Sequence, residues 1–289
     1  MIGGFARAVE EISRLHFVVA RSIWRLERPT STAMTTPAAP HITSLHRYPV
    51  KGLSPEALST VALEPGATLP FDRAYAVENG PGRFDPQVPR HLPKIAFLML
   101  MRDERLAALQ TRFDDATETL TILRDGRQVA KGQLSSPVGR QMIEQFLGAY
   151  MTTSLRGAPK VVQAKGHSFS DVPAKCLHIV NLASLRELER IAGRSVNALR
   201  FRPNVVIDGL PAWEEFRRLD RELALGSARI SVFARTQRCE ATNVDPTTAQ
   251  RDMAIPQLLQ RTWGHTDFGV YAKVTGPGAV TVADAVSAI

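Results

Sequence analysis

From His41 onward the chain is a succession of short, strand-like runs rather than of long helices. Apolar or alternating residues recur over short stretches with glycine and proline between them, which is typical of β-strands joined by turns. These runs occupy residues 41–50, 57–64, 74–78, 118–134, 204–209, 228–236 and 269–274. Asp125-Gly126 separates two alternating halves of 118–134 and is a strong hairpin signal. The pattern predicts a barrel or sandwich.

Two helices are expected among these strands. Residues 181–193 place four apolar side chains on one helical face, with Asn181 as the N-cap and Gly193 as the stop, and residues 254–263 form the second helix. No regular alternation of strand and helix is present, and no GxGxxG or P-loop motif follows a strand. A doubly wound nucleotide-binding fold is therefore disfavoured, and the fold class is α+β, mainly β.

Residues 1–40 differ from the rest of the chain. Their apolar residues recur at helical spacing but are interrupted by arginines, and residues 28–40 form a Pro/Ser/Thr/Ala linker. The uncharged stretches are far shorter than the ~18 apolar residues of a membrane-spanning helix. Two interpretations stay open: residues 1–28 contact a membrane surface as an interfacial helix, or they are an extension without function, with Met34 as an alternative start.

The charge balance favours an anionic partner. The chain has 36 Lys and Arg against 28 Asp and Glu, a formal net charge of +8. Nucleic acid is disfavoured, because only 4 Tyr and 3 Trp occur and no stretch interleaves aromatic with basic residues. Only two cysteines, Cys176 and Cys239, are present, so neither a disulfide framework nor a CxxC zinc site is supported. A reducing compartment, the cytoplasm, fits best.

Cys239 stands in "RTQRCEATNVDP", between two arginines and an Asp-Pro turn. We expect Arg235 and Arg238 to favour the thiolate, the form that attacks electrophiles and binds soft metals. The alternative is a small buried residue at the end of a strand. That interpretation suits Cys176, whose surroundings direct no thiol toward a cleft, and His178 is expected to be a core histidine. Three more basic residues, Lys51, Arg73 and Arg202, stand at strand ends, as anion contacts or as ordinary solvated charges.

Five motifs occur together in one order along the chain. They are "YPVK" at 48–51, Asp72-Arg73, "FRPN" at 201–204, Arg238-Cys239 followed by "VDP" at 244–246, and Phe268-Gly269 followed by Tyr271. With these motifs the chain from His41 resembles the molybdenum cofactor sulfurase C-terminal (MOSC) domain family with its N-terminal β-barrel region. It is similar to the mitochondrial amidoxime-reducing component and to bacterial reductases of N-hydroxylated compounds.

The resemblance implies a domain organisation. Residues 1–40 would be a poorly ordered extension, 41–135 a smaller N-terminal β-rich region, and 136–289 the β-barrel MOSC core with interspersed helices. It also implies a molybdenum cofactor, a metal held by a pterin dithiolene. Cys239 would be the metal ligand and catalytic residue. The cofactor-binding residues would be Lys51, Arg73, Ser170, Asp171, Arg202, Asn204, Arg238 and Tyr271.

By the same resemblance the protein is an oxidoreductase that reduces small N-oxygenated substrates. The chain has no iron–sulfur or dinucleotide signature, so a separate electron-donor reductase, a flavoprotein, heme protein or ferredoxin, is implied. The alternative is a carrier of sulfur, as a persulfide on Cys239, or of the cofactor without turnover. The chain departs from the family pattern at Gly52, where relatives often carry serine, and at Glu240, whose carboxylate beside the metal ligand is expected to affect substrate choice or donate a proton.

Overall fold

The computed structural model describes residues 39–80 and 82–289. These described residues form one compact unit. The predicted amphipathic segment, its membrane contact through residues 1–28 and most of the predicted linker lie outside the described residues. In the described part of the chain, no helix is both long and apolar enough to cross a bilayer.

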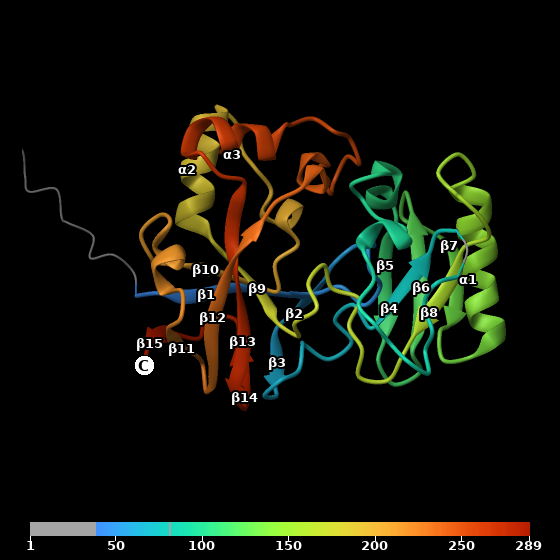
Figure 1. The fold of residues 1–289 in the computed structure, drawn as a ribbon, viewed down its shortest axis with the longest axis horizontal. Helices are drawn as coiled ribbons and strands as arrows, with labels where there is room; N and C mark the ends of the chain where they lie inside the picture. Colours follow the sequence, from blue (N-terminus) through green and yellow to red (C-terminus); the bar gives the residue numbers. More distant parts are fainter. Residues whose placement is uncertain (1–38, 81) are drawn as a thin grey trace, which may run out of the picture. The chain divides into compact units, whose positions relative to one another are not determined.

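The fold is mainly β, and its largest sheet has eight strands (Figure 1). In spatial order these are β15 (Val286–Ala288), β11 (Glu222–Leu225), β12 (Ala228–Gln237), β13 (Asp267–Gly276), β9 (Leu177–Asn181), β10 (Val205–Asp208), β1 (His41–Arg47) and β2 (Glu56–Leu58). Every neighbouring pair is antiparallel except β9 and β10. The core under this sheet is a single cluster of buried aliphatic side chains, to which β14 (Gly278–Thr281) and β3 (Thr60–Leu63) add a two-stranded sheet.

Two helices pack near one end of the large sheet. Helix α2 (Leu182–Ala192) follows β9 directly, and α3 (Ile255–Trp263) lies beside it. Side chains of both helices belong to one apolar cluster, which is separate from the core under the large sheet. The predicted caps of α2 are confirmed: the Asn181 side chain accepts a hydrogen bond from the Ala183 N–H, and Gly193 ends the helix with φ 68°. Glycine suits that end because it adopts the left-handed conformation without a Cβ clash.

A second group of elements forms its own apolar cluster. It contains the sheet β5 (Gln110–Asp114), β6 (Thr119–Arg124) and β7 (Arg127–Gln133), the pair β4 (Tyr75–Glu78) and β8 (Lys160–Gln163), and helix α1 (Pro137–Tyr150), which packs on β7 (Figure 1). The hairpin prediction is confirmed, since Asp125 and Gly126 join β6 to β7 with φ of 52° and 74°. These are the two left-handed residues of the tight turn that matches strand twist.

Helix α1 was not among the expected helices. Its signals are short-range: Ser136 caps its first turn by accepting from the Gly139 N–H, Pro137 begins it, and Ile143 and Leu147 are buried one turn apart. Five short 3₁₀ helices complete the chain: η1 (Lys94–Ala96), η2 (Glu104–Ala108), η3 (Ala198–Phe201), η4 (Glu214–Arg218) and η5 (Glu240–Asn243). The division at residues 135 and 136 stays a prediction.

Candidate functional site

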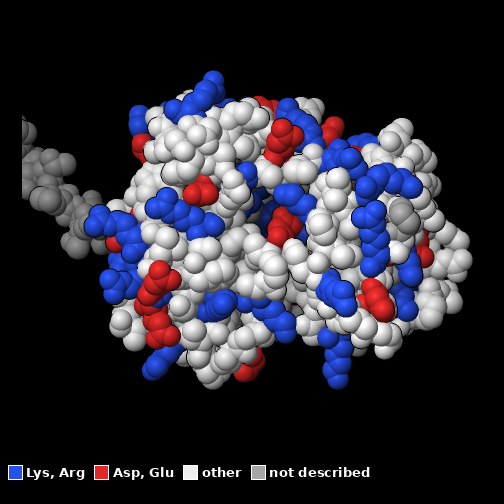
Figure 2. All heavy atoms as spheres, viewed as in Figure 1, with Lys and Arg blue, Asp and Glu red and all other residues white. Residues whose placement is uncertain are grey.

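The ends of several strands and loops meet around one cavity of about 390 Å³. Figure 2 shows Lys and Arg side chains gathered around a hollow near the middle of the displayed face. Six cationic side chains line this cavity, Lys51, Arg73, Lys94, Arg202, Arg235 and Arg238, against two acidic ones, Asp72 and Asp171. A volume of this size suits a small-molecule ligand, and the excess of cations favours an anionic one.

All nine residues predicted for the site line this cavity. Lys51 follows β1, Arg73 precedes β4, and Ser170 and Asp171 lie in the loop between β8 and β9. Arg202 and Asn204 lie between η3 and β10, Arg238 and Cys239 follow β12, and Tyr271 is on β13. Segments far apart in sequence therefore converge on one point, while the binding role of each side chain stays a prediction.

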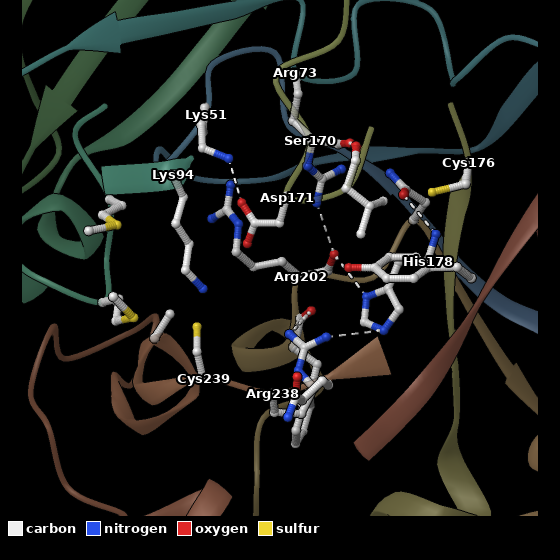
Figure 3. Close-up of a pocket in the computed structure, with 18 of the residues that line it drawn as sticks. Lys51, Arg73, Lys94, Ser170, Asp171, Cys176, His178, Arg202, Arg238 and Cys239 are labelled. Atoms are coloured by element: carbon white, nitrogen blue, oxygen red, sulfur yellow. Dashed lines mark hydrogen bonds and ion pairs between the residues drawn. The ribbon is translucent and has the colours of Figure 1, made fainter. Parts of the chain in front are cut away.

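Lys51 and Asp171 form an ion pair at the wall of the cavity (Figure 3). The Lys51 Nζ donates to the Asp171 carboxylate at 2.5 Å and to the Phe169 carbonyl at 2.8 Å. Burial disfavours the charged form of both groups, and it lowers the pKa of Lys51. At Asp171 the positive charge of Lys51 outweighs the effect of burial and holds the pKa of the carboxyl well below its usual range. The ion pair with Asp171 holds Lys51 in place.

Arg73 is held by a carboxylate, a carbonyl and an aromatic ring. Its guanidinium donates to Asp72 at 2.5 Å and to the Arg202 carbonyl at 3.2 Å, and it lies 4.6 Å from the Tyr48 ring centroid. Asp72 is itself 3% exposed and accepts from the Tyr48 N–H at 2.9 Å. Charge-assisted bonds of this kind fix the guanidinium at the edge of the cavity.

Arg202 and Arg238 carry polar atoms that no group of residues 39–80 and 82–289 satisfies. Arg202 donates to the Leu53 carbonyl and lies 4.1 Å from the Tyr48 ring, and Arg238 donates to the Phe201 carbonyl. The buried Nη2 of Arg202 and Nε of Arg238 have no hydrogen-bond partner among the described residues. Burial lowers the pKa of Arg202 to about 10 and also lowers that of Arg238. An anion in the cavity would satisfy these donors and relieve the cost of burying both charges.

His178 is buried, as expected, but it also lines the cavity. Burial and the charge of Arg238 lower its pKa well below the usual value, so the imidazole is neutral at pH 7. Its Nδ1 lies 3.4 Å from the Arg202 carbonyl and its Nε2 lies 3.4 Å from Arg238 Nη1. The fitting assignment is that Nδ1–H donates to the backbone carbonyl of Arg202 and Nε2 accepts from Arg238, so the ring helps to orient the Arg238 guanidinium.

We expect His178 to make the protein less stable in mild acid. The pKa of His178 is lower in the folded protein than in the unfolded chain, so the unfolded chain binds the proton first as the pH falls. The contribution of His178 to the free energy of unfolding is therefore fully present above about pH 6.5 and is lost below it. Between pH 7.5 and 5.5 this loss is about 1.4 kcal/mol. Urea unfolding of wild type and of His178→Gln at both pH values measures the difference. An equal loss in both proteins would contradict it.

Cys239 lies at the start of η5, and its loop is tied down on several sides. The Cys239 carbonyl accepts from the Thr242 hydroxyl at 2.9 Å. Buried Arg200 donates to the Thr242 and Asn243 carbonyls and to Asp245 and Asp252 at 2.7 Å each. The thiol is thus presented to the cavity from an anchored loop, and Figure 3 shows its sulfur directed inward.

Two predicted residues, Asn204 and Ser170, use their polar groups within the protein, and a third, Tyr271, packs through its ring. Asn204 is 1% exposed and joins β9 to β1, accepting from the His178 N–H and donating to the His46 carbonyl. The Ser170 hydroxyl donates to the Val172 carbonyl at 2.5 Å. The Tyr271 ring lies 5.6 Å from His178 and 6.2 Å from Phe233. Asn204 therefore supports the site by holding the backbones of β9 and β1 together. The Ser170 hydroxyl can act toward a ligand only as a hydrogen-bond acceptor, because its proton is already donated.

The expectation that Cys176 is buried is confirmed, but two other expectations from the sequence are wrong. Cys176 is buried, but it also lines the cavity, and burial raises the pKa of its thiol to about 12. Cys176 lies directly before strand β9, at the wall of the cavity. Glu240 does not line the cavity: its side chain is exposed, and its carbonyl accepts from Arg251. A role for the Glu240 carboxylate beside the metal ligand is therefore not supported.

Gly52 departs from the family pattern for a steric reason. Its φ is 84°, and a Cβ at this position would lie 2.9 Å from the Leu98 carbonyl oxygen. A serine would clash with the backbone here. The sequence also gave no signal for Lys94 or for Met99, Leu100 and Met101, which complete the wall, because they lie in an irregular segment without periodicity.

The arrangement fits a cofactor that carries both an anionic group and a soft metal. The unpartnered arginine donors suit phosphate oxygens, and a thiolate suits a soft metal. Among residues 39–80 and 82–289, no three His, Cys, Asp or Glu side chains come together as a metal-binding group. A metal beside Cys239 would therefore have this thiolate as its protein ligand and take others from the cofactor.

Comparisons with known proteins agree with the sequence motifs. Residues 39–156 match the model of the MOSC N-terminal beta barrel domain, and residues 165–287 match that of the MOSC domain. The mouse mitochondrial amidoxime-reducing component 1 is 29% identical over 37% of this chain and 35% of its own length. The human molybdenum cofactor sulfurase is 24% identical over 80% of this chain and 30% of its own length.

These alignments span about a third of the length of the curated relatives. Among solved structures, YiiM from Geobacillus stearothermophilus aligns over 39% of this chain and 53% of that chain at 19% identity, with a TM-score of 0.32, too low to carry an argument. The residues that the two family models match make up nearly all of the described residues. Residues from both matched ranges line the cavity. The chain belongs to the MOSC-domain proteins and carries the MOSC N-terminal beta barrel domain ahead of the MOSC domain.

Proposed function

We propose that the protein is a molybdenum-cofactor oxidoreductase that reduces N-hydroxylated compounds. The observation that carries this proposal is a cavity that combines an inward-facing thiol with buried arginine donors, which have no hydrogen-bond partner in the described part of the chain. The cavity also lies between the two domains of a family whose relatives are named for amidoxime reduction and for the molybdenum cofactor.

The residues divide into holders of the anionic group and one metal ligand. Arg202 and Arg238 offer their free N–H groups to the phosphate of the pterin, and Lys51 and Arg73, each fixed by an aspartate, add positive charge. Asp171 keeps Lys51 oriented, and Asn204 holds β9 against β1 below the site. Cys239 ligates the metal. The bound cofactor supplies the two-electron redox chemistry.

The overall reaction breaks the N–O bond of the substrate. It consumes two electrons and two protons, gives the N–H product, and releases the oxygen as water. The electrons come from a separate reductase, a flavoprotein, heme protein or ferredoxin. Both cysteines are free thiols, which supports a reducing compartment such as the cytoplasm.

Cofactor content tests the proposal directly. The protein is purified from a host that makes the molybdenum cofactor, and molybdenum is measured by elemental analysis and the pterin by fluorescence after oxidative release. We expect close to one molybdenum and one pterin per chain, and reduction of benzamidoxime with an artificial electron donor. Protein that is free of both from a competent host would overturn the proposal.

A second candidate is a carrier of sulfur or of the cofactor without turnover. It is favoured by the match to the human molybdenum cofactor sulfurase, which covers 80% of this chain. In that case Cys239 would carry sulfur as a persulfide. Mass spectrometry of the intact protein, with and without reductant, would show one extra sulfur on wild type and none on Cys239→Ala.

A further inference from the structure

Lys94 is a cation of the cavity wall that forms no ion pair. It lies at the start of η1, is half-buried, and lines the cavity. Figure 3 shows its amine directed toward the sulfur of Cys239. Its Nζ has no hydrogen-bond or ion-pair partner anywhere in 39–80 and 82–289, whereas Lys51 and Arg73 are each paired with an aspartate at 2.5 Å.

Both acidic groups of the cavity are already engaged. Asp171 accepts from Lys51 at 2.5 Å, and Lys94 forms no ion pair with it, although the charge of Lys94 contributes to the depressed pKa of that carboxyl. The second acidic group, Asp72, is 3% exposed and paired with Arg73. Lys94 therefore keeps its capacity to bind an anion that enters the cavity.

Lys94 comes from a different segment of the chain than the other cations of the cavity. This segment also supplies Met99, Leu100 and Met101 to the lining. The unpartnered guanidinium atoms belong to Arg202 and Arg238, which reach the cavity from other segments. The Lys94 segment thus contributes an apolar surface and one amine that is directed toward the Cys239 sulfur.

We propose that Lys94 is a specificity-determining residue that selects substrates carrying a carboxylate or a similar anionic group on an apolar body. The apolar side chains of Met99, Leu100 and Met101 contact the body, and the Lys94 amine pairs with the anion. The inference rests on the proposed function, because the substrate would bind on the Cys239 side of a cavity already holding the cofactor.

The test compares matched ligands on the protein purified from a cofactor-competent host. Calorimetry measures binding of benzoate and of benzamide, its neutral counterpart. Turnover is compared for para-carboxybenzamidoxime and benzamidoxime. For Lys94→Met we expect benzoate affinity and kcat/KM for the carboxylated substrate to fall about tenfold, the size of effect for a charge-assisted hydrogen bond. Benzamide binding, benzamidoxime turnover and molybdenum content stay unchanged.

Two variants make the result specific. Lys94→Arg keeps the charge and should retain the preference for the carboxylate. Arg90→Ala removes one positive charge from the same exposed segment, does not line the cavity, and should behave as wild type.

Three results decide the inference. Equal benzoate binding by wild type and Lys94→Met would overturn it. Loss of molybdenum from Lys94→Met would also overturn it, because Lys94 would then hold the cofactor. If wild type carries no molybdenum, the proposed function fails, but the calorimetric comparison still decides whether Lys94 binds the carboxylate.

Discussion

We expect that replacing Cys239 by alanine abolishes the proposed reduction of N-hydroxylated substrates and leaves the fold intact. The thiol is the one cysteine presented to the cavity from the anchored η5 loop, and its backbone, not its side chain, makes the local hydrogen bonds. Removing the sulfur therefore costs little stability. We expect the reductase activity to fall on the order of a thousandfold or more, as it does when a group acting at the reacting centre is lost.

Cys176→Ala is the matched control, because it also removes a thiol from the cavity wall. Burial raises the pKa of the Cys176 thiol to about 12, so this group is neutral and protonated at pH 7. Its replacement should leave molybdenum content and activity near those of wild type and cost about 1 kcal/mol of stability. Equal activity of the two variants, measured with the same electron donor, would rule out Cys239 as the metal ligand.

The sequence predicted the elements with strong local signals. The turn at Asp125-Gly126, the caps of α2 and the alternating strands β12 and β13 were all readable, because each depends on residues close together in the chain. Helix α1 was missed, although Ser136 and Pro137 mark its start, because its apolar face is short and interrupted by polar residues.

The cavity was only partly predictable, for a different reason. Seven of the nine predicted residues came from motifs shared with a family, and Ser170 and Asp171 came from the loop that the resemblance places at the cofactor. They converge because segments from the ranges matched by both domain models meet. Lys94 and Met99 come from an irregular segment, where neither periodicity nor a motif marks a residue. The orientation of Glu240 away from the cavity depends on how the loop is held by Arg200 and Arg251, which is a tertiary property.

Arg200→Met should destabilise the protein by about 3 kcal/mol, because it leaves a buried set of partners without their cation. The Arg200 side chain is 1% exposed and pairs with Asp245 and Asp252, each at 2.7 Å, while also donating to carbonyls of η5. Methionine restores the volume but none of these bonds. Since η5 begins beside Cys239, the variant should also lose part of its cofactor.

The matched control is Arg194→Met, which removes a partner of the same Asp252 at an exposed site. The Arg194 side chain is 50% exposed, and a surface pair of this kind contributes about 0–1 kcal/mol. Urea unfolding of the three proteins gives the comparison, and molybdenum analysis reports on the loop. Equal destabilisation by the two substitutions would mean that Arg200 does not anchor the loop. A large loss of both stability and molybdenum in Arg200→Met alone would indicate that this buried cation, which does not line the cavity, holds Cys239 in position.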